Sequence, residues 1–426
     1  MIQKVVVIYP FLKKELKDPN FNPEDHLEEA CGLAEAINLE VVSRENIALS
    51  KINPASYIGK GNLEKIKLHV EQMGANLVFV NYDVSPVQQR NLEKILKTKV
   101  IDRTGLILEI FGSRAKTSEG KLQVELASLT YQKTRLVKAW THLERQRGGF
   151  GFMGGPGESQ LEMDKRLLSE RIVKIKTELT HVKRTRSLQR TARKKVPLNV
   201  VALVGYTNAG KSTLFNNLTR SDVFAEDMLF ATLDPTLRRL KLPSGREVVL
   251  SDTVGFVSKL PHELVSAFHA TLEEVLEATI ILHVRDIFSA QTAFQNQEVL
   301  KVLKNIGCSD ERPMIEVLNK VDKLDDDQKD VWLNQLSREK DTVFLSALTG
   351  VGMIDLLKMI DQKLDSFAHE VVYDIPYQNN DALSWLFRYA NVKEQKHEET
   401  HTTVKVAITL EKEAQFQKKY PEVING

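Results

Sequence analysis

The stretch Gly205-Tyr206-Thr207-Asn208-Ala209-Gly210-Lys211-Ser212 decides the fold of the middle of this chain. It follows an apolar run, Leu198–Val204, that is typical of a buried strand, and a helix-like segment, Thr213–Leu218, comes after it. This order is the G-x-x-x-x-G-K-S phosphate-binding loop in its strand–loop–helix setting. The glycines let main-chain amides surround phosphate groups at the positive end of the helix. We therefore expect a doubly wound α/β domain that holds phosphates through Lys211 and Mg²⁺ through Ser212.

A second phosphate motif, Asp252-Thr253-Val254-Gly255, ends the strand-like run Val248–Ser251. This is a D-x-x-G sequence, in which the carboxylate of Asp252 would hold Mg²⁺ through water. The amide of Gly255 would meet the γ-phosphate. The segment from Asp252 to His262 is interpreted as the second of two nucleotide-sensing switches.

Two further motifs at the ends of predicted strands indicate which base is bound. The first, Asn319-Lys320-Val321-Asp322, is an N-K-x-D tetrad. The carboxylate of Asp322 would accept hydrogen bonds from N1–H and the exocyclic amine of guanine, and Asn319 would support the O6/N7 edge. Adenine lacks this pair of donors. The second motif, Ser346-Ala347-Leu348, would add main-chain contacts to O6. Together the motifs predict that the bound nucleotide is GTP and not ATP.

The segment Phe230-Ala231-Thr232-Leu233-Asp234-Pro235-Thr236 is interpreted as the first switch. A threonine here would complete the Mg²⁺ shell in the GTP state. Thr232 is the first choice, and Thr236 is the alternative. The predicted catalytic residues are Lys211, Thr232 and Gly255, and the predicted Mg²⁺ ligands are Ser212, Thr232 and Asp252. The predicted GTP-binding residues are Gly205, Tyr206, Thr207, Asn208, Ala209, Gly210, Lys211, Ser212, Thr213, Phe230, Ala231, Thr232, Leu233, Asp234, Asp252, Thr253, Val254, Gly255, Asn319, Lys320, Asp322, Ser346, Ala347 and Leu348.

The catalytic set is incomplete at one position. Ras-like enzymes carry a water-orienting glutamine directly after D-x-x-G, and this chain has Phe256 there. A phenylalanine cannot hydrogen-bond to water, so we expect slow intrinsic hydrolysis that a partner or a cation accelerates. Asn208 is a candidate ligand for a K⁺ ion acting as an arginine finger, as in some related GTPases. Capping of the loop by Asn208 is the alternative.

Residues 1–112 predict a small α/β domain with a mostly parallel sheet, because short apolar runs alternate with a helical pattern. The strand-like runs are Lys4–Tyr9, Leu39–Val42, Leu77–Val80 and Val100–Asp102. Residues 197–367 form the predicted nucleotide domain. Residues 368–426 predict a small α+β domain, with alternation at Val371–Ile375 and Val404–Leu410 around a helical stretch, Leu383–Tyr389.

Residues 113–196 predict an antiparallel helical hairpin. Two heptad seams, from Leu122 to Leu143 and from Leu161 to Val182, flank a glycine-rich tip at 144–160. The hairpin ends in a basic linker, since His181 to Lys195 holds seven lysines or arginines and no acidic residue. Such a run suits an anionic partner. The two seams can satisfy each other within one chain, which favours a monomer.

The amino-acid composition limits which kinds of partner, metal site and cellular location we expect for this chain. The chain carries 59 basic and 57 acidic residues, so its overall charge indicates no partner. Its two cysteines, Cys31 and Cys308, exclude a disulfide framework and a cysteine-rich metal site. The sequence shows no apolar run of about 20 residues and no secretory leader. We therefore expect a cytoplasmic protein without integral membrane contact, and no DNA partner.

Three stretches outside the nucleotide motifs are similar to hallmarks of one family. They are Asp102-Arg103-Thr104-Gly105, Glu119–Leu126 (EGKLQVEL) and Gly154–Glu162 (GGPGESQLE). With the switch segment Phe230–Pro235, they make the chain resemble the HflX family of translation-associated GTPases over most of its length. One departure is Arg285, at the end of a strand-like run that we expect to be apolar.

The resemblance implies a bacterial protein that binds the large ribosomal subunit in its GTP form. It implies a role in splitting or rescuing stalled ribosomes, or in ribosome biogenesis, and a hairpin tip that reaches toward the peptidyl-transferase region. A long arm with a basic run and a glycine-rich tip independently suits structured RNA, which is recognised by shape and phosphate.

Two other functions are open at this point. A constitutive ribosomal-RNA-binding factor could keep the nucleotide as a mainly structural ligand, and the incomplete catalytic set and the basic arm favour it. A GTPase acting on tRNA or at a membrane is the other, although the sequence shows no amphipathic anchor or lipidation motif. Replacing Lys211 separates the first from a GTP-driven switch, because a constitutive binder keeps its affinity for ribosomes without GTP.

Overall fold

The computed structural model describes residues 3–18, 21–146, 160–194, 198–220, 229–230, 236–258, 269–309, 312–336, 341–366 and 368–425. These residues form two compact units. The first unit comprises Met1–Thr185 with Glu226–Asp234 and Ser258–His269. The second comprises Arg186–Ala225, Pro235–Val257 and Ala270–Gly426. Phe230, in the first switch segment, and Ser258, in the second, therefore belong to the first unit, whereas the residues between 235 and 257 belong to the second.

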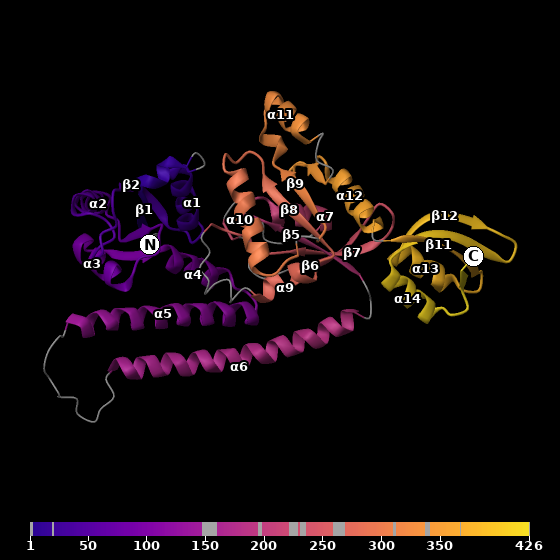
Figure 1. Cartoon of the computed structure of the whole chain (residues 1–426), viewed down its shortest axis with the longest axis horizontal. Coiled ribbons are helices and arrows are strands. Elements are labelled where there is room, and N and C mark those ends of the chain that lie inside the picture. Colours follow the sequence, from indigo (N-terminus) through magenta and orange to yellow (C-terminus); the bar gives the residue numbers. More distant parts are fainter. Residues whose placement is uncertain are drawn as a thin grey trace. The chain divides into compact units, whose positions relative to one another are not determined.

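The first unit contains a four-stranded, fully parallel sheet in the order β2-β1-β3-β4. Its strands are β1 (Lys4–Leu12), β2 (Glu40–Leu49), β3 (Leu77–Val80) and β4 (Lys99–Asp102). The connecting helices are η1 (Lys13–Lys17), α1 (Pro23–Glu35), α2 (Lys60–Met73), α3 (Pro86–Leu96) and α4 (Arg103–Arg114) (Figure 1). The predicted parallel α/β sheet is confirmed, with Val6, Ile8 and Val78 fully buried in its core.

Two long helices follow, α5 (Ser118–Gln146) and α6 (Gln160–Lys194), and they lie side by side in Figure 1. An ion pair of 2.7 Å between Arg171 and Glu125 joins them. The predicted seam is buried along α6 at Ile172, Ile175 and Leu179. On α5 the buried apolar positions are instead Val124 and Ala127, because this helix also packs against α3 and α4. The glycine-rich tip, at 147–159, lies outside the described residues.

The second unit is built on a six-stranded sheet in the order β10-β9-β8-β5-β7-β6. Its strands are β5 (Asn199–Gly205), β6 (Thr236–Lys241), β7 (Glu247–Asp252), β8 (Ile280–Asp286), β9 (Met314–Asn319) and β10 (Thr342–Phe344). Only the β6–β7 pair is antiparallel. The helices are α7 (Lys211–Thr219), α9 (His269–Glu277), α10 (Thr292–Asn305), η2 (Val321–Lys323), α11 (Asp326–Leu336) and α12 (Met353–Asp365). This is the predicted P-loop GTPase fold, and the carboxyl ends of its parallel strands share one edge.

Strand β8 explains the departure noted at Arg285. The structure pairs its guanidinium with the carboxylate of Glu316 on the neighbouring strand β9, at 2.9 Å. Burial and the nearby cations Arg285 and Lys211 lower the pKa of His283, on the same strand, to about 3. His283 is therefore neutral near physiological pH, and the partly buried charge of Arg285 is balanced by Glu316 across the sheet.

The C-terminal domain belongs to the same compact unit as the nucleotide domain. Its antiparallel sheet has the order β12-β13-β11-β14, formed by β11 (His369–Pro376), β12 (Asn391–His397), β13 (His401–Ile408) and β14 (Ile424–Asn425). Helices α13 (Asn380–Tyr389) and α14 (Leu410–Lys419) complete it. The predicted strand alternation at Val404–Leu410 extends two residues too far, because β13 ends at Ile408 and Leu410 begins α14. Within the part of the chain that the structure describes, no helix meets the length and apolarity that a bilayer crossing requires.

Candidate nucleotide-binding site

The phosphate loop joins β5 to α7 and adopts the strained conformation that its glycines permit. Gly210 caps α7 with φ +92°, a region that favours glycine. A Cβ at this position would also collide with the side-chain amide of Asn319. The Nζ of Lys211 donates to the carbonyl of Tyr206 at 2.8 Å, so the lysine folds back over the loop. This geometry leaves a cradle of main-chain amides above the start of the helix.

Lys211 is almost fully buried, with 6% of its surface exposed. Burial lowers the pKa of this amine to about 8, and the nearby carboxylate of Asp252 only partly opposes the shift. A bound phosphate would add negative charge to that of Asp252 and raise the pKa of the amine again. The ammonium group is therefore placed to gain most from an anionic ligand.

Ser212 and Asp252 provide the oxygen donors expected for Mg²⁺. The hydroxyl of Ser212, in the first turn of α7, donates to the carboxylate of Asp252 at 2.8 Å. Asp252 ends β7 and is fully buried. A hydroxyl and a carboxylate at this spacing fit a small, hard cation that keeps several of its waters.

The D-x-x-G segment runs directly alongside the phosphate loop. The amide of Thr207 donates to the carbonyl of Phe256 at 2.7 Å, and the amide of Phe256 donates to the carbonyl of Gly205 at 3.1 Å. A Cβ on Gly255 would lie 2.9 Å from the Cα of Thr207 and 3.0 Å from the Nζ of Lys211. Only glycine allows this approach. The ring of Phe256 is buried, so this position offers no polar group to a water.

The guanine motifs are locked to the loop by Asn319, at the end of β9. Its amide nitrogen donates to the carbonyl of Ala209 at 2.8 Å, and its oxygen accepts from the amide of Ala347 at 2.8 Å. The hydroxyl of Ser346 donates to Asp322 at 2.5 Å, which fixes the orientation of the carboxylate. Asp322 is exposed, and an acceptor oriented in this way favours a base that carries matching donors.

The structure thus brings four motifs together at the carboxyl edge of one sheet, but the first switch is not among them. Residues 231–235, including Thr232 and Asp234, lie outside the described residues. Phe230 belongs to the first unit, where its ring meets that of Phe111 edge-on at 4.7 Å between centroids. The alternative, Thr236, begins β6 and pairs with Asp252 in the sheet register.

Two residues at the site were missed by sequence reasoning. Asn217, on α7, donates to the carbonyl of Ala347. Asp286 forms an ion pair of 2.8 Å with Lys320 of the N-K-x-D tetrad. Asp286 ends β8 at the carboxyl edge of the sheet. An acidic residue at the end of an apolar strand-like run could have indicated its place at the site. No sequence signal marked Asn217, because polar residues are common on helices.

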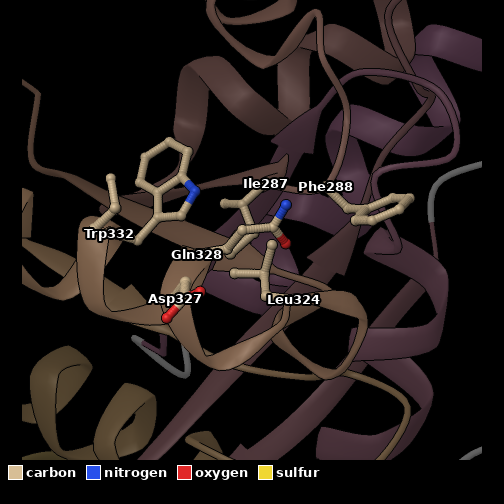
Figure 2. Close-up of a pocket in the computed structure, with 7 residues that line it drawn as sticks. Ile287, Phe288, Leu324, Asp327, Gln328 and Trp332 are labelled. Carbon is tan, nitrogen blue, oxygen red and sulfur yellow. The ribbon is translucent and has the colours of Figure 1, made fainter.

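A separate surface cavity of about 300 Å³ lies near the tetrad in the sequence (Figure 2). Its walls come from the loop after β8, the residue after η2, and helix α11. The lining residues are Ile287, Phe288, Leu324, Asp327, Gln328, Val331 and Trp332. Figure 2 shows Trp332 and Phe288 at opposite ends, with Ile287, Leu324 and Gln328 between them. None of these is a predicted GTP-binding residue, so the cavity is distinct from the nucleotide site.

Nucleotide binding at alkaline pH is expected to draw a proton onto Lys211. With a pKa of about 8, much of this amine is neutral at pH 8.5, and bound phosphates would stabilise its charged form. Affinity should therefore fall as the pH rises through 8, because the site must first be protonated. Calorimetry of a GTP analogue at pH 8.5, in buffers of different ionisation enthalpy, measures this uptake. Equal uptake by a Lys211→Ala variant would contradict the assignment.

Comparison with family models covers most of the chain. Residues 24–112 match the "GTP-binding GTPase N-terminal" model and residues 114–193 the "GTP-binding GTPase Middle Region" model. Residues 200–320 match a model described as "50S ribosome-binding GTPase", and residues 332–422 match the "HflX C-terminal domain" model. Two of these four models are specific to parts of the chain outside the nucleotide motifs.

Individual relatives agree with the models. GTPase HflX of Magnetococcus marinus is 48% identical over 384 residues, which cover 90% of this chain and 88% of the relative. GTPase HflX of Escherichia coli is 43% identical over 374 residues, covering 88% and 87%. A solved GTP-binding protein of Sulfolobus solfataricus in complex with GDP is 25% identical, with a TM-score of 0.45 and coverage of 86% and 99%. The chain belongs to the HflX family and is a GTP-binding GTPase.

Proposed function

We propose that the chain is a GTP-driven switch on the large ribosomal subunit, with a role in ribosome splitting, rescue or biogenesis. The observation that carries this proposal is the match of residues 200–320 to the 50S ribosome-binding GTPase model. The two phosphate motifs lie within that segment, which ends at Lys320, the second residue of the N-K-x-D tetrad. GTP orders the switch segments, the ordered form binds the subunit, and hydrolysis releases it. We further propose that the chain acts in the cytoplasm as a monomer.

The helical hairpin supports contact with RNA rather than with DNA or a membrane. Helices α5 and α6 have 29 and 35 residues, which at about 1.5 Å per residue gives arms of roughly 45 and 50 Å. The sequence near the end of α6 is rich in lysine and arginine and has no acidic residue between His181 and Lys195. Clustered cations of this kind bind phosphate backbones without reading the base sequence. Structured RNA is recognised in this way.

We propose that Mg²⁺ is held by Ser212 and Asp252, with Thr232 added from the first switch. The metal would neutralise charge on the phosphate oxygens as the γ-phosphoryl group leaves. Lys211 would hold the β- and γ-phosphates, and the main chain of Gly255 would contact the γ-phosphate. Since Phe256 is buried and apolar, the group that orients water has to come from elsewhere.

Subunit-dependent hydrolysis tests the proposal. We expect isolated large subunits to raise the rate of GTP hydrolysis by about tenfold or more, because they would supply the missing catalytic arrangement. Small subunits should have little effect. Reversing the charge of Arg186, Arg190 and Arg193 in α6 should reduce the stimulation, while the same reversal at Lys165, Lys174 and Lys176 of this helix serves as the matched control. Equal stimulation by both subunits would contradict the proposal.

A potassium ion is proposed as an auxiliary activator at Asn208. This residue sits in the phosphate loop with φ +61°, and its carbonyl oxygen is a suitable ligand for a monovalent cation. Exchanging Na⁺ for K⁺ should raise the hydrolysis rate by about tenfold or more, because a cation near the transferred phosphoryl group can replace an arginine finger. An Asn208→Ala variant should lose the difference. Identical rates in the two salts would leave Asn208 as a cap of the loop.

A further inference from the structure

The β6–β7 hairpin connects the two switch segments, and it has two distinct ends. One end lies at the nucleotide site, where Thr236 pairs with Asp252. The other is the turn from Leu242 to Arg246, closed by main-chain hydrogen bonds of 2.8 and 2.9 Å. Six strand residues at about 3.3 Å each place the turn roughly 20 Å from Asp252. Because the two strands are paired in register from Thr236 to Lys241, the turn and the open end belong to one hydrogen-bonded ladder.

Two carboxylates of α12 hold the turn. The amide and hydroxyl of Ser244 donate to the two oxygens of Asp361, at 3.0 and 2.7 Å. The guanidinium of Arg246, of which only 4% is exposed, donates to one oxygen of Asp365 at 2.5 Å. A charged group buried to this extent depends strongly on its partner. The position of the turn is therefore set by the last two turns of α12.

The second oxygen of Asp365 is bound by the C-terminal domain. The amide of Asn391 donates to it at 2.6 Å and the ammonium group of Lys393 at 2.7 Å. Both residues belong to β12. A single carboxylate thus receives the hairpin turn on one oxygen and the C-terminal sheet on the other. Burial disfavours the charge of Asp365, but bonds from Lys393 and Arg246 outweigh this and hold its pKa below the usual value.

A further pair reinforces the same connection. The guanidinium of Arg388, on α13, donates to the carboxylate of Glu247 at 3.0 Å, and Glu247 is the first residue of β7. The side chains of this pair are 44% and 26% exposed, so the pair contributes less than the Asp365 cluster. Together the contacts join the C-terminal domain to both the turn and the start of the strand that ends in Asp252.

We propose that Asp365 is a positioning residue through which the C-terminal domain sets the place of the β6–β7 hairpin, and with it nucleotide binding and hydrolysis. A ligand that moves β12 would therefore be felt at Asp252, at the other end of the hairpin. The inference concerns the isolated GTPase and does not depend on the ribosomal partner.

The sharpest test alters only the C-terminal side of the carboxylate. An Asn391→Ala/Lys393→Met variant leaves the Arg246–Asp365 pair in place. We expect it to change the release rate of fluorescent GDP by about threefold or more, within the range of coupling through packed networks. The matched control is Glu370→Gln/Lys405→Met, which removes an exposed ion pair of 2.7 Å in the same sheet. Its release rate should equal that of the unmodified chain.

A double-mutant cycle distinguishes positioning from simple stabilisation. Adding Asp365→Asn to the β12 variant should change GDP release no further than Asp365→Asn alone, because both act through the same carboxylate. Unchanged GDP release in the β12 variant, with only a lower unfolding temperature, would overturn the proposal. So would effects that simply add. If a multiple variant fails to fold, Lys393→Met alone, at a partly exposed position, gives the same decision.

Discussion

An Asp322→Asn substitution is expected to lower the affinity for GTP by at least about a hundredfold and to favour xanthosine triphosphate instead. The carboxylate of Asp322 would offer two acceptors to the N1–H and exocyclic amine of guanine. An asparagine amide would face one of these donors with a donor of its own, leaving both without an acceptor. Xanthine carries a carbonyl in place of the amine, and it would accept from the new amide.

A change in affinity can be attributed to base recognition, because the side chain at position 322 is held in place independently of the base. The hydroxyl of Ser346 donates to Asp322 at 2.5 Å, and an asparagine oxygen can accept the same bond. Competition calorimetry with the two triphosphates measures the reversal. Asp326→Asn is the matched control, since that carboxylate is 98% exposed four residues along the chain. Unchanged GTP affinity in the Asp322→Asn variant would remove this residue from base recognition.

Replacing Lys211 with alanine is expected to reduce GTP hydrolysis by about a hundredfold to a thousandfold, the cost of removing one charged donor from a developing oxyanion. The amine is buried beside the loop, 2.8 Å from the carbonyl of Tyr206. Its ammonium form is disfavoured before the nucleotide arrives, as its pKa of about 8 shows. The nucleotide-free chain should therefore lose little stability on this substitution. The stabilisation that GTP confers on unfolding should largely disappear.

Single-turnover hydrolysis and thermal unfolding, each with and without nucleotide, check both parts of this prediction. Lys358→Ala, at an exposed position on α12, is the matched control and should behave as the unmodified chain. The Lys211→Ala variant also distinguishes a GTP-driven switch on the ribosome from a constitutive ribosomal-RNA-binding factor. A Lys211→Ala protein that binds large subunits as tightly as the unmodified chain would show that the nucleotide is mainly structural.

Much of the fold could be predicted from short apolar runs, because strands covered on both faces have nearly continuous apolar sequences. The run at Leu77–Val80 coincides with β3, and the expected strand before the phosphate loop is β5. Strand β12 escaped prediction for the opposite reason. It lies at the edge of its sheet and is mostly exposed, with Val392 as its only apolar residue between Asn391 and His397. A polar edge strand carries no apolar signal.

In the candidate site, too, local features could be predicted from the sequence, whereas contacts between distant residues could not. The phosphate loop could be predicted because its conformation is local, depending on glycines such as Gly210 within a few residues. The hydrogen bond between Asn217 and Ala347 joins residues that are 130 positions apart. The bond between Arg246 and Asp365 joins residues that are 119 positions apart. Pairings of this length depend on how the whole domain packs. No spacing of residue types in the sequence specifies them.

Binding to isolated large ribosomal subunits tests the central claim most directly. The purified chain is sedimented with large or small subunits at fixed salt, with a non-hydrolysable GTP analogue, with GDP or without nucleotide. We predict co-sedimentation with the large subunit in the presence of the GTP analogue, and little with GDP or without nucleotide. Equal binding in all three states would contradict the switch and favour a constitutive RNA-binding role, and absence of binding would contradict the ribosomal partner.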